Sequence, residues 1–572
     1  AAAGNLAALI AATGDASVTA AGNLIVGGTA VNLATNSGGT TSFGVTTLTG
    51  GLNTSSVGDI TQTGAITTGA ASSIASATGN VVLTNPDNSF FGATTLTGVD
   101  VTVAAAGSLN ALIAATGNAS VTAAGNLTVG GSATNLSTSS TGTTSFGVTT
   151  LTGALTANSV GDITQTGAII TGAPSSISSS TGDITLNNAG NSFFGATSFS
   201  GQDVAVAAAG NLEALIAATG DASVTSAGNL IVGGSAVNLS TSSAGTTSFG
   251  ATTLTGGLNT TSVGDITQTG AITTGAPSSI TSSTGDITLT NPNNSFFGAT
   301  TLSGVDVTVV AAGNLQALIT ATGNASANSA GNLTVSGTAV NLATTSGGAT
   351  SFGLTTLTGG LTTTSVGDIT QTGAITTAAA SSITSSTGDI VLINPGNAFS
   401  GATSLTATLG DLGFAGSVAG SLTTTSGGAT SFGATTLTGG LTTTSVGDIT
   451  QTGALITGAA SSITSSTGDI TLTNPGNSFF GATTLSGVDV TVVAAGDLNA
   501  LIAATGNASA NSAGNLTVSG TAVNLATNSG GTTSFGATTL TGGLTATSVG
   551  DITQTGAIIT GAASSITSST GD

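Results

Sequence analysis

Short segments in which apolar and polar residues alternate recur along the whole chain. Residues 286–290 (Asp-Ile-Thr-Leu-Thr), 305–310 and 332–337 each place an aliphatic side chain at every second position. A period of two is the pattern of a β-strand with one buried face. Gly and Asn separate the segments, and an Asn-Pro turn signal recurs at Asn85, Asn291, Asn394 and Asn474. The pattern predicts short strands joined by tight turns.

The segments themselves repeat at a fixed distance. The Phe of Thr-Ser-Phe-Gly lies 103 residues from its next copy, except for one interval of 80, at Phe43, Phe146, Phe249, Phe352, Phe432 and Phe535. A fixed period of this kind indicates a solenoid. Asp265, Asp286 and Asp306 mark steps of 21 and 20 residues inside one copy. We therefore interpret a copy as five coils, and the shorter copy as having lost one coil, which a stack of coils tolerates.

These observations predict an all-β fold, a right-handed parallel β-helix (β-solenoid) with about 20–21 residues per coil and five coils per 103-residue repeat. Each coil is expected to hold three short strands. Residues 498–506, which are rich in Leu, could also form a helical turn, but the Ala and Gly around them favour a strand. We predict a single continuous β-solenoid over 1–572, with repeats at 58–160, 161–263, 264–366, 367–446 (one coil short) and 447–549, and partial repeats at 1–57 and 550–572.

The composition argues against several functions. The chain has no Lys, Arg, His, Cys, Met, Trp or Tyr, and its acidic residues give a net charge of −21. Without a cation it cannot neutralise phosphates, so we expect no nucleic-acid partner and no attraction to anionic membranes. No apolar run approaches the roughly 20 residues of a membrane-spanning helix. Without Cys, disulfides and thiolate metal sites are excluded.

Catalysis is not expected. A serine nucleophile needs a His or Lys base, and the chain has neither. The paired carboxylates of a glycosidase lie about 5–9.5 Å apart. The pairs considered for such a site are Asp87 with Asp100 and Asp203 with Glu213, and Glu213 has no counterpart in the other repeats. We therefore predict no enzyme, no catalytic residues and no bound cofactor.

One aspartate recurs in a Val-Gly-Asp segment of every repeat, at Asp59, Asp162, Asp265, Asp368, Asp448 and Asp551. Calcium needs six to eight oxygens in one place, and equivalent aspartates five coils apart cannot share an ion or form a ladder. We interpret them as turn residues that bond their own backbone and predict no metal site. Loosely bound Ca²⁺ bridging two negatively charged rods is the one exception left open.

Adjacent phenylalanines are the candidate lateral-contact residues, because consecutive side chains of a strand point to opposite faces. They are Phe90, Phe91, Phe193, Phe194, Phe296, Phe297, Phe479 and Phe480. The short repeat has Ser400 after Phe399, which removes one ring. One ring of each pair would then be exposed, unless both turn into the core at a corner. The single Phe43 and its equivalents are expected in the core.

Two polar motifs leave alternatives open. Gln62 and its equivalents are either internal hydrogen-bonding residues or mark a turn, and the turn is favoured. Pairs such as Thr253 and Thr255 are typical of ice-binding solenoids. An ice-binding face needs such pairs in consecutive coils on one face, and here the motifs differ from coil to coil, so this alternative ranks low.

Residues 355–377, 465–479 and 514–531 resemble the repeat region of filamentous haemagglutinin-like exoproteins, which are large bacterial adhesins typically exported by two-partner secretion. The resemblance covers the whole chain and rests on the general sequence pattern of the repeats, not on a unique motif. It implies an extracellular, right-handed β-helical shaft. The lack of Lys and Arg departs from that family, and neither its secretion domain nor an effector domain is recognised in the sequence.

We therefore expect a secreted extracellular or cell-surface structural protein, the rod-like shaft or filament of a bacterial adhesin. The first alternative is a self-assembling sheath or biofilm-matrix filament, and the second is an ice- or polysaccharide-binding solenoid. Expected partners are the chain itself, laterally or end to end, and a host or neighbouring cell surface. Both termini fall inside a repeat, so we expect a segment of a longer array.

Overall fold

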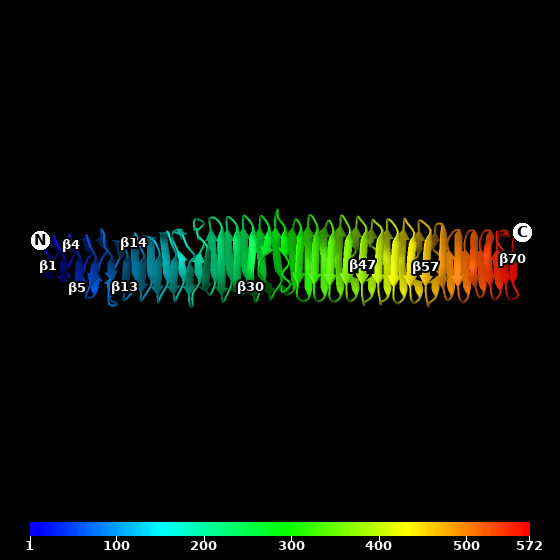
Figure 1. The fold of residues 1–572 in the computed structure, drawn as a ribbon, viewed down its shortest axis with the longest axis horizontal. Coiled ribbons are helices and arrows are strands. Elements are labelled where there is room, and N and C mark those ends of the chain that lie inside the picture. Colours follow the sequence, from blue (N-terminus) through cyan, green and yellow to red (C-terminus); the bar gives the residue numbers. More distant parts are fainter. The chain divides into compact units, whose positions relative to one another are not determined.

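The computed structural model describes all 572 residues and consists of strands and turns without a helix. The chain forms two compact units, Ala1–Gly285 and Asp286–Asp572. Within each unit a strand pairs in parallel with the strand about one turn, roughly 19 residues, further along the chain. The all-β parallel solenoid is thereby confirmed. In Figure 1 the strands of the first unit, from β1 (Leu6–Ala11) to β30 (Thr247–Leu254), stand side by side in this way.

A turn of the solenoid has three straight segments. In the first unit they are β7 (Ile60–Gln62), β8 (Ile66–Thr68) and β9 (Ser72–Ser76). In the preceding turn the first two segments are one bent strand, β5 (Thr41–Leu48), whose beginning pairs with β7 and whose end pairs with β8. The third segment, β6 (Leu52–Ser56), pairs with β9. The three predicted segments are therefore present, with the first two often joined.

The bend in the long strands depends on one glycine. In β3 (Leu24–Ala30) the register with β5 shifts between Val26 and Gly28, where Gly28 has a φ of 116°. A Cβ at this position would overlap the carbonyl oxygen of Ile10 in the turn before. Gly is the residue that tolerates a positive φ and this close backbone approach.

The strands alternate between two sheets in each unit. In the first unit one sheet contains β3 and β5, the other β4 (Leu33–Ser37) and β6; we call them the β3 sheet and the β4 sheet. The next strands of this unit are β10 (Val81–Leu83), β11 (Ser89–Phe90), β12 (Ala93–Gly98), β13 (Val101–Ala105), β14 (Leu109–Ala115), β15 (Ala119–Ala123), β16 (Leu127–Ala133), β17 (Leu136–Ser140) and β18 (Thr144–Leu151).

In the second unit the corresponding sheets are called the β42 sheet and the β43 sheet. The β42 sheet includes β42 (Leu342–Ser346), β44 (Leu361–Ser365), β47 (Ser381–Ser385), β50 (Thr403–Ala407), β52 (Leu422–Ser426), β54 (Leu441–Ser445), β57 (Ser461–Ser465) and β60 (Ala482–Gly487). The β43 sheet includes β43 (Thr350–Leu357), β45 (Ile369–Gln371), β46 (Ile375–Thr377), β48 (Ile390–Leu392), β49 (Ala398–Phe399), β51 (Leu412–Val418), β53 (Thr430–Leu437), β55 (Ile449–Gln451), β56 (Leu455–Thr457), β58 (Ile470–Leu472), β59 (Ser478–Phe479) and β61 (Val490–Ala494). The Leu-rich segment at 498–506 contains strand β62 (Leu498–Ala504), as favoured from the sequence.

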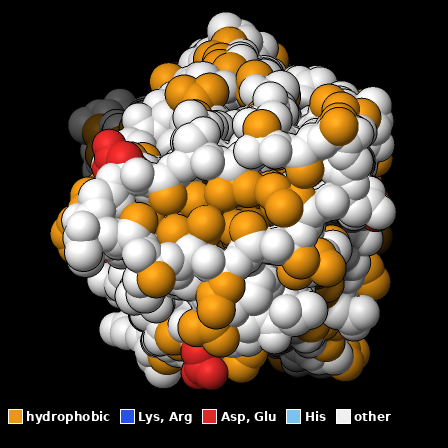
Figure 2. Space-filling view, turned by 90° about the vertical axis from the view of Figure 1, so that its left-hand side faces the viewer, with side chains coloured by type: hydrophobic (Ala, Val, Ile, Leu, Met, Phe, Trp, Pro, Cys, Tyr) orange, Lys and Arg blue, Asp and Glu red, His pale blue; other side chains and the backbone are white.

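The core lies between the sheets. Every second side chain points inward, and Phe43 and its five equivalents are fully buried, which confirms their predicted place. Figure 2, viewed from the side of β1, shows apolar side chains gathered in the middle of the section, and others scattered on the outside among polar side chains and backbone. Each buried aliphatic side chain contributes about 1.5–3 kcal/mol. Inward hydroxyls bond one another between turns, as in Thr35 to Thr54 at 3.1 Å.

A copy of 103 residues makes five and a half turns. In the first unit the register runs from Thr41 through five turns to Leu136, by way of Ile60, Val81, Val101 and Ala119. Thr144, which is equivalent to Thr41, follows in β18 of the opposite sheet. The predicted 20–21 residues per coil are therefore too many. The aspartates used as marks fall in the longer turns, whereas other turns have only 17 or 18 residues, as between Ala119 and Leu136.

The half turn places equivalent residues of successive copies in opposite sheets. Phe43 lies in the β3 sheet, and Phe146 lies in the β4 sheet. The short copy behaves differently, because Thr350 reaches Thr430 after four turns, through Ile369, Ile390 and Leu412. It is therefore one and a half turns shorter than a regular copy, and not one coil shorter as predicted. Four is a whole number, so Phe352 and Phe432 share the β43 sheet.

Candidate functional site

Each phenylalanine pair has one buried and one exposed ring. Phe90, Phe193, Phe296 and Phe479 are at most 5% exposed, whereas Phe91, Phe194, Phe297 and Phe480 are between 66% and 70% exposed. The alternative in which both rings are in the core is therefore wrong. In the first unit Phe91 follows β11 in the β3 sheet, and Phe194 follows the bridge from Ser192 to Ile170 in the β4 sheet. The exposed rings of this unit do not line up on one side.

Gln62 marks a turn and is also an internal hydrogen-bonding residue, so both alternatives apply. The chain bends directly after Gln62, between β7 and β8, as favoured from the sequence. The side chain also hydrogen-bonds to Asn88, which is fully buried. Asn88 was missed at the sequence level, although it follows Gln62 by 26 residues and the same pair recurs in Gln165–Asn191, Gln371–Asn397 and Gln451–Asn477.

The recurrent aspartates belong to ladders that follow a corner of the solenoid. Asp59 Oδ1 accepts a hydrogen bond from the backbone N–H of Asn80 in the next turn at 2.8 Å, and Asn80 Oδ1 accepts one from Asp100 N–H at 3.0 Å. Asp100 Oδ1 in turn accepts from Asn118 N–H at 2.7 Å. The prediction that these aspartates bond their own backbone is wrong, because the acceptor serves a donor one turn away. The prediction that they could form no ladder overlooked the Asp and Asn residues of neighbouring turns.

The acidic run with the most aspartates, interrupted once, lies in the second unit, whereas the longest uninterrupted run is Asp162, Asp183, Asp203 and Asp221 in the first. Six aspartates occupy one corner within seven consecutive turns, with Ala429 in the remaining place: Asp368, Asp389, Asp411, Asp448, Asp469 and Asp489. The run is this long because the short copy spans a whole number of turns and leaves the next acidic stretch on the same corner. Its Oδ1 atoms accept backbone N–H groups at 2.6–3.0 Å. The carboxylates are spread along the corner, and no three acidic residues form a group that could hold a metal ion.

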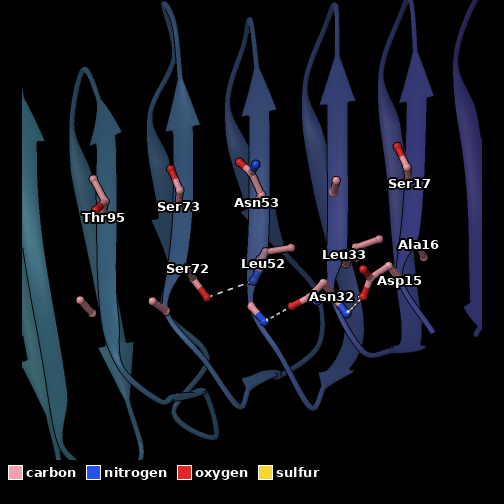
Figure 3. A pocket seen from close by; sticks show the side chains of 14 residues that line it. Asp15, Ala16, Ser17, Asn32, Leu33, Leu52, Asn53, Ser72, Ser73 and Thr95 are labelled. Atoms are coloured by element: carbon pink, nitrogen blue, oxygen red, sulfur yellow. Dashed lines mark hydrogen bonds between the residues drawn. The ribbon is translucent and has the colours of Figure 1, made fainter. Parts of the chain in front are cut away.

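A shallow hollow accompanies the start of a ladder in the first unit. It has a volume of about 660 Å³ and lies on the outer face of β2 (Ala16–Ala20), β4, β6 and β9. Figure 3 shows Asn32 bonded to Asp15, and Ser17, Asn53, Ser73 and Thr95 in one row, with the strand β4 between those of Ser17 and Asn53. The hollow forms where the corner residue changes from Asn32 to Gly51, which removes a side chain. Comparable hollows recur beside Asp100 in this unit and beside Asp306 and Asp489 in the other.

The pairs considered for glycoside hydrolysis are not assembled into a site. Asp203 lies on the corner before β25 (Val204–Ala208), where its Oδ1 accepts from Asp221 N–H at 2.7 Å. Glu213 is an exposed residue of β26 (Leu212–Ala218) in the opposite sheet. Asp100 bonds in its ladder, and Asp87 lies on an exposed turn next to Asn85.

Outward threonines of the β42 sheet are in register from strand to strand, although their motifs differ from coil to coil. Thr364, Thr384 and Thr406 pair strand by strand, and the column continues through Thr425 and Thr444. The motifs do differ in letters, from Thr-Thr-Thr in β44 to Ser-Ile-Thr in β47 and Ser-Leu-Thr in β50. Each nevertheless presents a hydroxyl at its first and third position, so the outward faces agree.

The fold defines a class, that of tandem-repeat β-solenoids, and such a repeat fold is typical of structural proteins. The family described as "Repeats of unknown function (DUF5649)" matches residues 28–97, 133–200, 234–303, 339–406, 419–486 and 522–572. These segments make up more than half of the chain, which therefore belongs to this family. Comparison with curated proteins and with solved structures gave no match. No helix of the structure has the length and apolar character needed to cross a membrane.

Proposed function

We propose that the chain is an extracellular structural protein, the shaft of a bacterial adhesin of the filamentous haemagglutinin-like type. The observation that carries this proposal is the short copy, Thr350 to Thr430. It removes one and a half turns, and yet the register through Ile369, Ile390 and Leu412 stays continuous. An enzyme fixes the distance between its groups, whereas a shaft can change its length as long as its turns continue to stack in register.

The chemistry supports a mechanical role. The chain carries no Lys, Arg or His, so it offers no base for a serine nucleophile and no cation for a phosphate. We propose that it is not an enzyme, that it needs no cofactor, and that it does not bind nucleic acid. Its partners would be further copies of itself and a host or neighbouring cell surface, with Ca²⁺ as a loose bridge between negatively charged copies.

A self-assembling sheath or matrix filament is the second candidate, and the exposed phenylalanines favour it. Phe91 and Phe194 leave the two sheets of the first unit on different sides, and each ring is about two thirds exposed. Such rings are candidate contacts to neighbouring chains on more than one side. The natural Ser400 shows that the position after the buried ring accepts a small polar residue.

Electron cryomicroscopy of the purified chain, with and without Ca²⁺, tests both candidates. A shaft gives isolated elongated particles at every protein concentration. A sheath gives bundles or continuous filaments, and these should disappear when Phe91, Phe194, Phe297 and Phe480 are replaced by Ser. Compact round particles would contradict both. Antibody labelling of intact cells that produce the protein tests its location, and labelling only after permeabilisation would contradict an extracellular shaft.

A further inference from the structure

The outer face of the β42 sheet carries two parallel columns of hydroxyl groups over seven consecutive strands, from β44 to β60. We call these fourteen residues the hydroxyl face. The first column is Thr362, Ser382, Ser404, Thr423, Thr442, Ser462 and Thr484. The second column is Thr364, Thr384, Thr406, Thr425, Thr444, Thr464 and Ser486.

The hydroxyl face is regular in two directions. Paired residues of neighbouring strands lie about 4.8 Å apart, and the two columns are separated by two residues of a strand, about 6.6 Å. Most positions are Thr, whose branched Cβ restricts χ1 and so fixes the directions of its hydroxyl and methyl groups. The face is therefore a fixed two-dimensional lattice of alternating donors, acceptors and methyl groups.

The hydroxyls of this face are free to bind a ligand. Inward threonines of the same strands hydrogen-bond to each other, as Thr424 does to Thr443 at 3.0 Å. The outward hydroxyls make no hydrogen bond within the chain, and Thr423, Thr425, Thr442 and Thr444 in the middle of the face are exposed. A ligand could therefore hydrogen-bond to these hydroxyls without breaking a hydrogen bond within the protein.

The face is also uncharged on a strongly acidic chain. The corner residues that precede its strands are small and neutral, for example Ala380, Ser421 and Ala460. The aspartates of this part of the unit lie before the strands of the β43 sheet, as Asp411 does before β51. A neutral face on a chain with 21 negative charges and no positive charge fits a neutral occupant and offers nothing to a charged one.

The short copy creates the length of this face. In the first unit the comparable outward row on β2, β4, β6 and β9 reads Ser17, Ala34, Asn53 and Ser73, so a methyl group and an amide interrupt the hydroxyls. In the first unit a regular copy ends half a turn out of phase, so the equivalent strands of the next copy lie in the other sheet. In the second unit the four-turn copy leaves two such runs on the same sheet, and they join without an interruption.

We propose that the hydroxyl face binds an ordered water lattice, the surface of ice. Both of its spacings are of the size at which oxygen atoms repeat on a prism face of ice, and an array of fixed hydroxyls can continue a hydrogen-bonded water network at little entropic cost. The methyl groups between the hydroxyls limit competing water positions. A neutral polysaccharide is the other neutral occupant, but the face has no aromatic ring on which a sugar could stack and no amide to fix its orientation. The proposal adds a function to the shaft and does not depend on it.

Ice affinity of the full chain tests the proposal. The fluorescently labelled protein is added to a slowly growing ice hemisphere, and its incorporation is compared with that of the variant Thr406→Lys, Thr425→Lys, Thr444→Lys. The matched control is Thr436→Lys, Thr450→Lys, Thr471→Lys, three exposed outward threonines on β53, β55 and β58 of the opposite sheet. We expect incorporation of the wild type and of the control, and exclusion of the triple variant to the level of a protein that does not bind ice.

The outcomes separate the alternatives. Exclusion of the wild type from ice would overturn the proposal, and so would equal incorporation of all three proteins. Co-sedimentation of the wild type with an insoluble neutral glucan, lost in the triple variant and accompanied by exclusion from ice, would assign the face to a polysaccharide. Circular dichroism confirms that each variant is folded. Because Thr425→Val replaces the hydroxyl by a methyl group of similar size, it supplies a second variant without an added charge, and it should weaken incorporation in the same direction.

Discussion

Gln62 and Asn88 face each other amide to amide, with Gln62 Nε2 donating to Asn88 Oδ1 at 2.8 Å and Asn88 Nδ2 donating to Gln62 Oε1 at 2.9 Å. Asn88 also accepts from the Ile66 N–H and donates to the carbonyls of Leu83 and Ala104. The pair thus satisfies the backbone where β7 ends and β8 begins. A break in the sheet is tolerated there because the two amides replace the missing ladder.

Replacing Asn88 by Ala should open this turn. The change removes the acceptor of the Ile66 N–H and a donor to each of two carbonyls, and a buried group left without a partner costs about 1–3 kcal/mol. Hydrogen exchange measured by mass spectrometry should therefore speed up in peptides that cover β7 to β11. The control is Asn53→Ala, an exposed residue of β6. Equal exchange in the two variants would show that the amide pair does not hold the turn.

Gly28→Ala should destabilise the first unit far more than Gly44→Ala. Gly28 has a positive φ, and its added methyl would overlap the backbone of Ile10, whereas the nearest atoms to a Cβ at Gly44 are 4.0 Å away. A left-handed conformation costs a non-glycine residue about 1–2 kcal/mol, and the overlap adds to this cost. Thermal unfolding followed by circular dichroism measures the difference. A lower midpoint for Gly44→Ala than for Gly28→Ala would contradict the assigned bend.

The acidic corner of the second unit should respond to salt. Asp411→Asn and Asp469→Asn keep the Oδ1 acceptor and remove a charge that faces like charges one turn away. We expect both variants to unfold at a higher temperature than the wild type at low ionic strength. The difference should disappear in about 1 M salt, where the Debye length is only about 3 Å. Asp411→Ala, which also loses the acceptor for Ala429 N–H, should be less stable than Asp411→Asn at every salt concentration. A salt-independent difference between Asp and Asn would argue against repulsion along the corner.

The adjacent rings of Phe479 and Phe480 should contribute very differently to the free energy of unfolding. Phe479 is 4% exposed and Phe480 is 69% exposed. Phe479→Ala should cost about 3–5 kcal/mol, the usual range for a core phenylalanine. Phe480→Ala should leave stability almost unchanged. Urea unfolding read by hydrogen exchange around β59 distinguishes them, since a long repeat array need not unfold in one step. A large loss for Phe480→Ala would mean that this ring packs within the chain.

The sequence was sufficient for the fold class because alternation at segments such as 286–290 reports directly which side chains point inward. Turn length was harder, because aspartates mark the long turns and Asn118 or Asn135 takes the corner in the short ones. The ladders were missed for the same reason, since Asp and Asn are different letters with the same Oδ1 acceptor. The threonine columns join residues from unlike segments, Thr364 beside Thr384 and Thr406, and only the register of the strands brings them together.

Because each regular copy ends half a turn out of phase, the side on which a motif lies depends on whether an odd or an even number of copies precedes it. Any feature that occurs once per copy changes sides with each regular copy, as Phe43 and Phe146 do in the first unit. A copy with a whole number of turns suspends this alternation for one step, as between Phe352 and Phe432. Adding or deleting a single copy would therefore reassign every later motif of that unit to the other side, while adding or deleting two would restore it. Copy number in such an array sets the pattern of its surface as well as its length.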